Sequence, residues 1–159
     1  MIKLVQMRDD EFARYVEAII SSYAKDIARS RMTSEKKEHL DYARKQINTI
    51  LPKGNITDNH YFYSIYNENQ KIGAVWFSIQ EGSLIFMHDI FLDKSHRRKG
   101  YGSEAIKQVE SMAIKKGVRS IALHVFYHNK AAQRFYKKNG YLITGLQMFK
   151  QLSDPQPKI

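Results

Sequence analysis

The sequence predicts an α/β (α+β) fold: a single mixed, mostly antiparallel β-sheet of six to seven strands, flanked by about four helices. The length of 159 residues suits one domain, which can bury a core without disulfides. Apolar residues recur at helical spacing through the first 51 residues, short strand-like runs follow, and strands and helices alternate after residue 92. The sequence has no cysteine, which excludes disulfides, iron–sulfur clusters, Cys-ligated zinc and a thiol nucleophile.

The N-terminal third predicts one strand followed by two amphipathic helices. Ile2–Met7 is short and apolar, as expected for a strand. Asp9 or Asp10 can cap a helix that runs to about Arg29, and the Thr-Ser pair at 33–34 can cap the second helix. Both helices carry their apolar residues on one face.

Three strands and two short turns come next, and the turn lengths predict antiparallel hairpins. The strands cover Tyr61–Tyr66, Ile72–Ile79 and Leu84–Leu92. The second and third are nearly continuous in apolar residues, which is typical of strands buried on both faces. Beyond them we expect a helix over 100–116, a strand over 120–126, a helix over 129–139, and one strand or a bent pair over 141–152. The strand–helix–strand order between residues 84 and 126 implies a right-handed parallel crossover.

We expect one domain over residues 1–152 and a loose C-terminal tail over 153–159. No stretch approaches the ~20 apolar residues of a membrane span. The N-terminal residues lack the apolar region of a signal peptide. These features predict a cytoplasmic protein with no membrane partner.

The net charge of +10 is concentrated in one third of the chain. Residues 94–138 hold twelve basic and two acidic residues, so the remainder of the chain is neutral. Such a segment suits an anion, which could be a nucleic acid, a membrane surface or a phosphorylated small molecule. A solvated basic face without a partner would have the same composition.

A glycine-containing segment joins a strand to a helix within this basic third. It reads Arg97-Arg-Lys-Gly100-Tyr-Gly102-Ser103. Glycines let several backbone N–H groups face one ligand, and a helix N-terminus adds partial positive charge, so the segment suits a pyrophosphate. It lacks the Gly-Lys-Ser/Thr ending of a Walker loop and the third glycine of the dinucleotide motif. A tight strand-to-helix connection would look the same.

A second cluster spans the following strand and helix. Asn129 can cap that helix, a role that needs no ligand. Tyr136 lies two helical turns further along, on roughly the same face. An inward tyrosine on a short amphipathic helix is commonly a core residue.

The two clusters together resemble the motifs of one enzyme family. Arg97-x-x-Gly100-x-Gly102 is similar to the Q/R-x-x-G-x-G/A motif of the GNAT superfamily of acyl-CoA-dependent N-acetyltransferases. The pattern Leu123-x-Val125-x-x-x-Asn129-x-x-Ala132-x-x-x-Tyr136-x-x-x-Gly140-Tyr141 resembles that family's fifth strand and fourth helix. The resemblance is to small, mostly uncharacterised bacterial members and covers residues 84–152 well. Before Tyr61 only the layout of one strand and two helices is similar.

The resemblance implies a GNAT fold, with residues 84–152 as the acetyl-CoA-binding core and residues 1–60 as acceptor-side strand and helices. The backbone of Ile90 and Leu92 would pair with the pantetheine chain of the coenzyme, which requires the fourth and fifth strands to splay apart. Coenzyme binding would also involve Arg97, Arg98, Lys99, Gly100, Tyr101, Gly102, Ser103 and Asn129.

The resemblance further implies direct attack of a primary amine on acetyl-CoA within a ternary complex. Tyr136 would donate a proton to the departing thiolate. The amine must attack as a free base, and His88, Asp89 or a water relay would take its proton. The family often has a glutamate here, whereas this chain has none between Gly82 and Ser103. His88 and Asp89 are neighbours, so they point to opposite faces of the sheet unless a bulge intervenes.

The expected acceptor is the amine of a small molecule or a peptide. No metal site is expected, because the six histidines show no ligand spacing. No nucleic-acid partner is expected on the GNAT interpretation, although a basic nucleic-acid-binding module is one alternative function. The other is a catalytically silent CoA-binding regulator on the same fold. A homodimer is consistent with the resemblance, because family members are often dimers.

Overall fold

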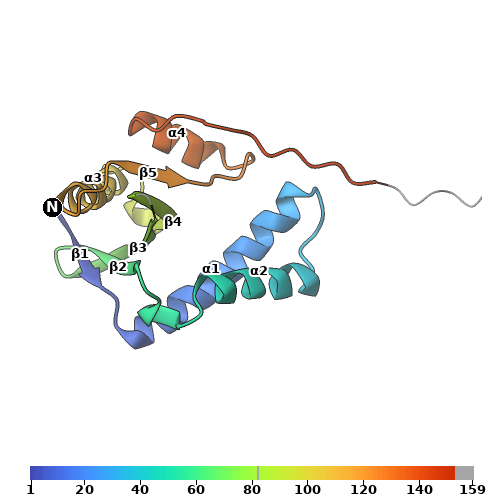
Figure 1. Ribbon diagram of the computed structural model, residues 1–159, viewed down its shortest axis with the longest axis horizontal. Coiled ribbons are helices and arrows are strands. Elements are labelled where there is room, and N and C mark those ends of the chain that lie inside the picture. The colour runs from blue at the N-terminus through green and yellow to red at the C-terminus, as the bar shows by residue number, and fades with distance from the viewer. Residues whose placement is uncertain (82, 153–159) are drawn as a thin grey trace, which may run out of the picture.

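The computed structural model describes residues 1–81 and 83–152, so the tail expected over 153–159 lies outside the described residues. Within them, five strands form one sheet in the order β1-β2-β3-β4-β5, together with four α-helices (Figure 1). The elements are β1 (Ile2–Gln6), α1 (Asp9–Ser30), α2 (Lys37–Ile50), β2 (His60–Asn67), β3 (Gln70–Gln80), β4 (Leu84–Leu92), α3 (Tyr101–Lys115), β5 (Ser120–Leu123) and α4 (Lys130–Lys138), with short 3₁₀ turns at Gly54–Ile56 (η1) and Lys94–His96 (η2). The α/β class and the four helices are confirmed.

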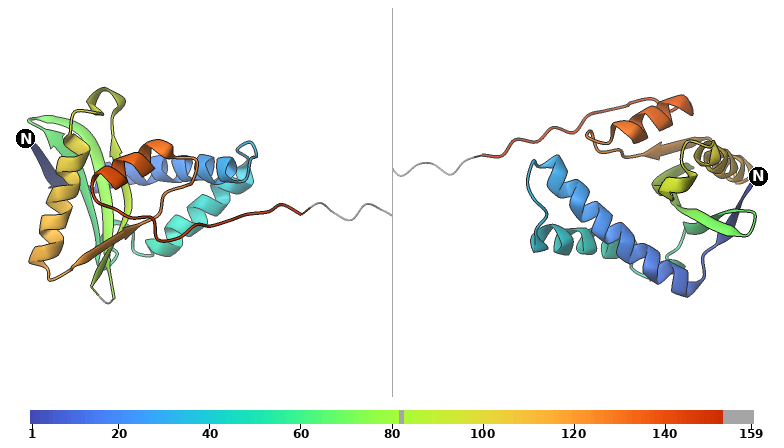
Figure 2. Two further views of the ribbon diagram at one scale, coloured as in Figure 1. Left: turned by 90° about the horizontal axis from the view of Figure 1, so that it is seen from above. Right: turned by 180° about the vertical axis from the view of Figure 1, so that it is seen from behind.

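The sheet is antiparallel from β1 to β4 and parallel between β4 and β5, as the sequence predicts. α3 makes the crossover between β4 and β5 and covers one face of the sheet, while α1 and α2 cover the other (Figure 2). The arrangement has three layers, with the sheet in the middle.

Each face of the sheet has its own hydrophobic core. Toward α3, the buried side chains include Val75 and Phe77 of β3, packed against Val109 and its helical neighbours. Toward α1 and α2, they include Trp76 of β3 and Ile20 of α1. β3 is therefore buried on both faces, which explains its nearly continuous apolar sequence.

The starts of the first two helices differ from the prediction. α1 is preceded by Arg8, whose backbone N–H donates to the Glu11 carboxylate at 3.1 Å. Asp9 and Asp10 lie inside the first turn, where their charges favour the helix dipole. α2 begins at Lys37, so its cap is Lys36, two residues after Ser34, and the ring of His39 accepts the Lys36 N–H at 3.0 Å.

The prediction of six to seven strands is wrong, because the last expected strand is not formed. Among the described residues, 141–152 contain no helix or strand. A strand needs a neighbour for its backbone N–H and C=O groups. The chain instead leaves α4 at Gly140 and extends away from the sheet (Figures 1 and 2). No described helix is both long and apolar enough to cross a membrane.

Candidate functional site

The centre of β4 contains a β-bulge at His88. Trp76 of β3 lies opposite Asp89 and Phe77 lies opposite Met87, so His88 is an extra residue in the ladder. A bulge of this kind cancels the alternation of side chains between the two faces. His88 and Asp89 therefore both face α1 and α2, which neighbouring residues of a regular strand cannot do.

The bulge lies where β4 loses its partner on one side. β5 pairs with β4 only from Leu84 to Met87. After Leu123 the chain turns toward α1, where the His128 ring lies 2.9 Å from the Asp26 carboxylate. Within the described part of the chain, residues 88–92 of β4 thus have no strand beside them on this edge. The splayed strands that the resemblance requires are present.

The backbone groups that face this open edge belong to two predicted residues. The N–H of Asp93 donates to the Ile72 carbonyl of β3 at 2.9 Å. Because backbone groups of an antiparallel strand alternate in direction, the groups of Ile90 and Leu92 point away from β3. The side chain of Arg97 confirms this direction, since its Nε donates to the Leu92 carbonyl at 2.8 Å.

The loop between β4 and α3 presents a row of backbone N–H groups. Arg98 and Gly100 both have left-handed backbone conformations, with φ of +59° and +87°. Alternating conformations of this kind form concave anion-binding turns. None of the N–H groups from Arg98 to Ser103 donates to an acceptor within residues 1–81 and 83–152. They remain available at the positive end of the α3 dipole.

Several residues predicted to bind the coenzyme make contacts that hold this loop in place. The Arg97 guanidinium, besides its bond to Leu92, lies over the Phe91 ring at 5.9 Å. Tyr101 Oη accepts a hydrogen bond from the Asn67 side chain of β2 at 3.2 Å. A Cβ at Gly102 would approach the Phe135 ring of α4 to 3.1 Å, so this glycine allows α4 to pack on α3.

α4 brings two further predicted residues to the same region. Asn129 caps the helix by accepting the Ala132 N–H at 3.0 Å, which leaves its side-chain NH₂ group for other partners. The Tyr136 ring meets the Tyr141 ring edge-on at 5.4 Å between centroids. Burial, then the negative charge of Asp89, raises the pKa of Tyr136, so the phenol stays protonated at neutral pH. Tyr136 and Asp89 are therefore close enough to interact, although they come from different elements.

The carboxylate of Asp89 is half-buried and is held by a residue that the sequence analysis missed. Tyr15 of α1 donates its hydroxyl proton to Asp89 Oδ2 at 2.7 Å. Burial raises the pKa of Asp89 to about 6, while the Tyr15 hydrogen bond opposes the rise. Tyr15 lies three residues after Phe12, on the face of α1 that packs against the hydrophobic core. A tyrosine among apolar residues on a helix face places a hydroxyl where it needs a hydrogen-bond partner, and this is the feature of the sequence that could have identified it.

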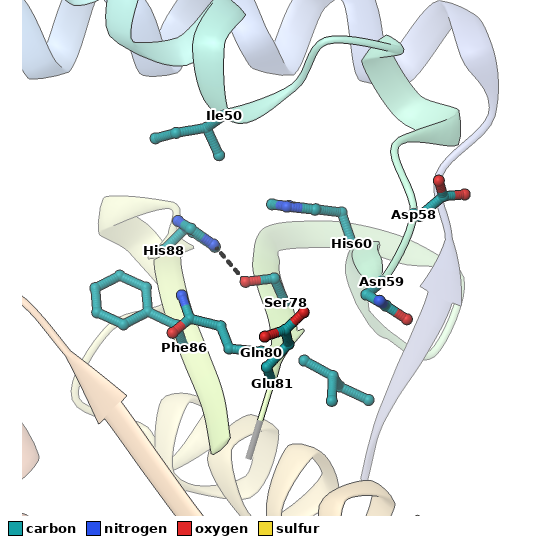
Figure 3. A pocket seen from close by; sticks show the side chains of 10 residues that line it. Ile50, Asp58, Asn59, His60, Ser78, Gln80, Glu81, Phe86 and His88 are labelled. Carbon is teal, nitrogen blue, oxygen red and sulfur yellow. Dashed lines mark hydrogen bonds between the residues drawn. The ribbon is translucent and has the colours of Figure 1, made fainter. Parts of the chain in front are cut away.

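His88 sits beside a pocket of about 440 Å³ on the same face of the sheet (Figure 3). Its Nε2 lies 2.8 Å from Ser78 Oγ, and its ring stacks on Trp76 at 4.2 Å and on His60 at 5.3 Å. Burial, then the neighbouring His60, lowers the pKa of His88 to about 4. Trp76 Nε1–H donates to His60 Nδ1 at 3.0 Å, which fixes His60 with its proton on Nε2. Both imidazoles are neutral at pH 7.

The rim of this pocket is acidic. Its described lining contains the carboxylates of Asp58 and Glu81 and no lysine or arginine, although the whole chain carries a net charge of +10. The Asp58 carboxylate is also paired with Lys53 at 2.9 Å. Neutral imidazoles, a serine hydroxyl and carboxylates offer hydrogen-bond acceptors to a cation or an amine.

Comparison with known proteins agrees with this geometry. Residues 20–141 match the model of the Acetyltransferase (GNAT) family. Two proteins of Bacillus subtilis (strain 168), the uncharacterized N-acetyltransferases YdgE and YycN, are 29% identical over 153 residues and 30% identical over 156 residues. The alignments cover 94% of this chain and 97% of YdgE, and 95% of this chain and 99% of YycN.

Solved structures show the same relationship. The crystal structure of YycN, a putative acetyltransferase, matches with a TM-score of 0.88 and 27% identity, over 97% of this chain and 100% of that one. PaiA N-acetyltransferase from Thermoplasma acidophilum, solved in complex with coenzyme A, shares the fold with a TM-score of 0.65 and 16% identity, over 92% and 93% of the two chains. Since the family model spans about three quarters of the sequence and two relatives match over nearly their whole length, the chain belongs to the GNAT family of acetyltransferases and is an acyltransferase.

Proposed function

We propose that this enzyme transfers an acetyl group from acetyl-CoA to a primary amine by direct attack in a ternary complex. The observation that carries the proposal is the position of the β4 bulge. It lies where the open edge of β4 begins, with the N–H-lined loop at the far end of that edge and the acidic pocket on the α1 and α2 side. The two substrates would meet at the bulge.

The coenzyme would bind along the open edge of β4. Its pyrophosphate would accept hydrogen bonds from the N–H groups of residues 98–103, because these groups have no acceptor among the described residues and lie at the helix N-terminus. Its pantetheine amides would pair with the backbone of Ile90 and Leu92, as an added strand would. The NH₂ group of Asn129 would contact the same chain. Lys99 and Arg98 would add positive charge near the phosphates.

The reaction would proceed in one addition and one elimination. The amine nitrogen attacks the thioester carbonyl carbon, and a backbone N–H at the open edge of β4 stabilises the oxyanion. Asp89 accepts the proton that the amine loses. The carbon–sulfur bond then breaks, and Tyr136 donates its phenolic proton to the departing thiolate. Its raised pKa keeps that proton available at neutral pH.

Asp89 is a better candidate for the base than His88. A base works best when its pKa lies near the working pH. The pKa of Asp89 is raised to about 6, whereas that of His88 is lowered to about 4. Asp89 is also held in place by Tyr15, while His88 faces the pocket through its contacts with Ser78 and His60. We assign His88 to the acceptor pocket.

The proposal is tested by combining a binding and a turnover measurement. Adding acetyl-CoA should shift the amide resonances of residues 98–103, and a panel of primary amines should release free CoA thiol. Coenzyme binding without release by any amine would support the silent regulator instead. Unchanged loop resonances at saturating coenzyme, with steeply salt-dependent binding of DNA or RNA, would favour the nucleic-acid-binding module.

Tyr136→Phe should lower kcat more than tenfold while acetyl-CoA still binds. The variant keeps the ring contacts with Phe135 and Tyr141 and removes only the proton donor. Steady-state kinetics and calorimetry of coenzyme binding separate the two effects. Tyr141→Phe is the matched control, because the Tyr141 hydroxyl has no hydrogen-bond partner among the described residues and is not assigned a role. Equal kcat for Tyr136→Phe and the wild type would remove the acid role.

A further inference from the structure

The segment that follows β5 has the sequence of a strand but leaves the sheet. Residues 124–128, which we call the exit segment, read His-Val-Phe-Tyr-His. β-branched and aromatic residues of this kind favour strands. The pattern predicts a strand that runs to residue 126, whereas β5 ends at Leu123. A contact made elsewhere in the fold must therefore keep the exit segment out of the sheet.

Continued pairing of the exit segment with β4 would close the edge on which the coenzyme is proposed to bind. β5 pairs with β4 in parallel, from Leu84 opposite Ser120 to Met87 opposite Leu123. The same register, continued, would place residues 124–128 opposite residues 88–92. A strand edge with free N–H and C=O groups readily accepts another strand. The open edge of β4 thus lies next to a segment of its own chain that is suited to cover it.

α1 holds the exit segment away from β4 through two side-chain contacts. His128 Nε2 lies 2.9 Å from Asp26 Oδ1, and because a carboxylate only accepts hydrogen bonds, Nε2 carries the proton and donates it. The His128 side chain is 17% exposed, so water competes little for this bond. The Phe126 ring lies between the rings of Tyr23 and His128, at 6.1 Å and 5.5 Å between centroids. Figure 1 shows the chain after β5 reaching toward the C-terminal end of α1.

The same face of α1 also holds β4. Tyr15 donates its hydroxyl proton to Asp89 at the bulge, and Asp26 follows Tyr15 by 11 residues. Eleven residues make close to three helical turns, so Tyr15 and Asp26 share one face of α1 and lie about 16 Å apart along its axis. One end of this face contacts β4 and the other contacts the exit segment. A single helix therefore sets how far the two strands separate beyond the bulge.

We infer that Asp26 and His128 are positioning residues, which keep the exit segment on α1 and so keep the edge of β4 open for the coenzyme. Without this pair, the exit segment would move onto β4 and compete with the coenzyme for its backbone groups. The pair also fixes the start of α4, because Asn129 follows His128 directly and its N–H donates to the Phe126 carbonyl at 2.9 Å. The inference rests on the proposed function, which assigns the coenzyme to this edge.

The first test measures the affinity for acetyl-CoA by calorimetry. His128→Phe keeps a ring stacked on Phe126 but loses the donor, and Asp26→Ala loses the acceptor. Each should raise the Kd roughly tenfold, the effect of losing one hydrogen bond to a charged group. Asp26→Asn should keep the wild-type Kd, because its amide oxygen still accepts the His128 proton. An unchanged Kd in His128→Phe and Asp26→Ala, or equal weakening by Asp26→Asn and Asp26→Ala, contradicts the inference.

Glu17→Ala is the matched control on the same helix. Glu17 accepts two hydrogen bonds from Arg44, at 2.7 Å and 2.9 Å, which join α1 to α2 and not to the exit segment. This variant should keep the wild-type Kd, whereas a loss equal to that of Asp26→Ala would reveal a general loosening of α1 and overturn the assignment. In His128→Phe the KM for acetyl-CoA should rise while kcat at saturating coenzyme is retained. A lower kcat with an unchanged KM would place the effect in the chemical step and refute a role at the binding edge.

The second test uses the enzyme without coenzyme, so its readout does not depend on the proposed function. Amide hydrogen exchange by NMR should be fast at Ile90 and Leu92 in the wild type and slow in His128→Phe, because the exit segment then covers these N–H groups. A wild type that shows this difference but binds no acetyl-CoA would overturn the proposed function alone. A wild type that binds acetyl-CoA, with equal exchange of these amides in both proteins, would overturn the role of the pair alone.

Discussion

Asp89→Asn is expected to lower kcat by about 10²- to 10⁴-fold, the range that a positioned acid–base group contributes. Asparagine has the shape of aspartate and still accepts the hydrogen bond from Tyr15, so the loss isolates the proton-accepting role. In the wild type, kcat/KM should rise with pH through an apparent pKa of about 6, because Asp89 must be ionised to act. Initial-rate measurements across pH provide both numbers. A variant that keeps the wild-type rate excludes Asp89 as the base.

The same substitution should stabilise the fold at neutral pH. The pKa of Asp89 is raised from its usual value of 3.8 to about 6, so the folded state favours the protonated carboxyl. The stabilisation that the protonated Asp89 carboxyl gives to the folded state is fully present below about pH 3.8 and is lost as the pH rises through about 6. The difference of about two units between the pKa of Asp89 in the unfolded and folded states lowers the free energy of unfolding of the wild type by at most about 3 kcal/mol at pH 7–8. Denaturant unfolding should show Asp89→Asn gaining stability over the wild type at pH 8 and little at pH 4.

Tyr15→Phe serves as the companion variant. Loss of its hydroxyl removes the hydrogen bond that opposes the rise in the pKa of Asp89, so that pKa should increase further. The acidic limb of the kcat/KM profile should then move to higher pH, while the rate on the alkaline plateau is largely preserved. A merely structural role for Tyr15 would lower the rate at every pH and leave the limb in place.

The local parts of this site follow from the sequence, because they depend on neighbouring residues. Gly100 has φ of +87°, a conformation that residues with a Cβ rarely adopt, and its position before an amphipathic helix predicts a turn with free N–H groups at the helix start. Asn129 caps α4 as its residue type predicts. β4 begins and ends where the apolar run does, at Leu84 and Leu92.

The parts of the site that join distant segments do not follow from the sequence, because they depend on the pairing register of the strands and on which elements pack together. The bulge at His88 exists only in the pairing of β3 with β4, and no residue type specifies it. Tyr15 meets Asp89 across 74 residues of sequence, through the packing of α1 on the sheet. The missing last strand has another cause: the apolar pattern of residues 141–152 is real, but strand formation also requires an adjacent edge, and this chain does not place one there.

Gly73→Ala should have the largest effect on stability, with a loss of about 3 kcal/mol or more in the free energy of unfolding. Gly73 of β3 lies opposite Leu92, and a Cβ there would overlap the carbonyl oxygen of Phe91 and lie 2.8 Å from Leu92 Cδ2. The obstacle is backbone, so it cannot move aside as a flexible side chain would, and the end of β4 must shift.

That end of β4 carries the open edge and leads into the coenzyme loop, so the variant should also lose affinity for acetyl-CoA. Gly117→Ala is the matched control. Gly117 has φ of +78° but open space around the added Cβ, so only the conformational cost of roughly 1–2 kcal/mol applies, and binding should be unaffected. Urea unfolding and calorimetry compare the two variants. Equal losses of stability would mean that close packing of β3 against β4 at Gly73 does not hold the binding edge in place.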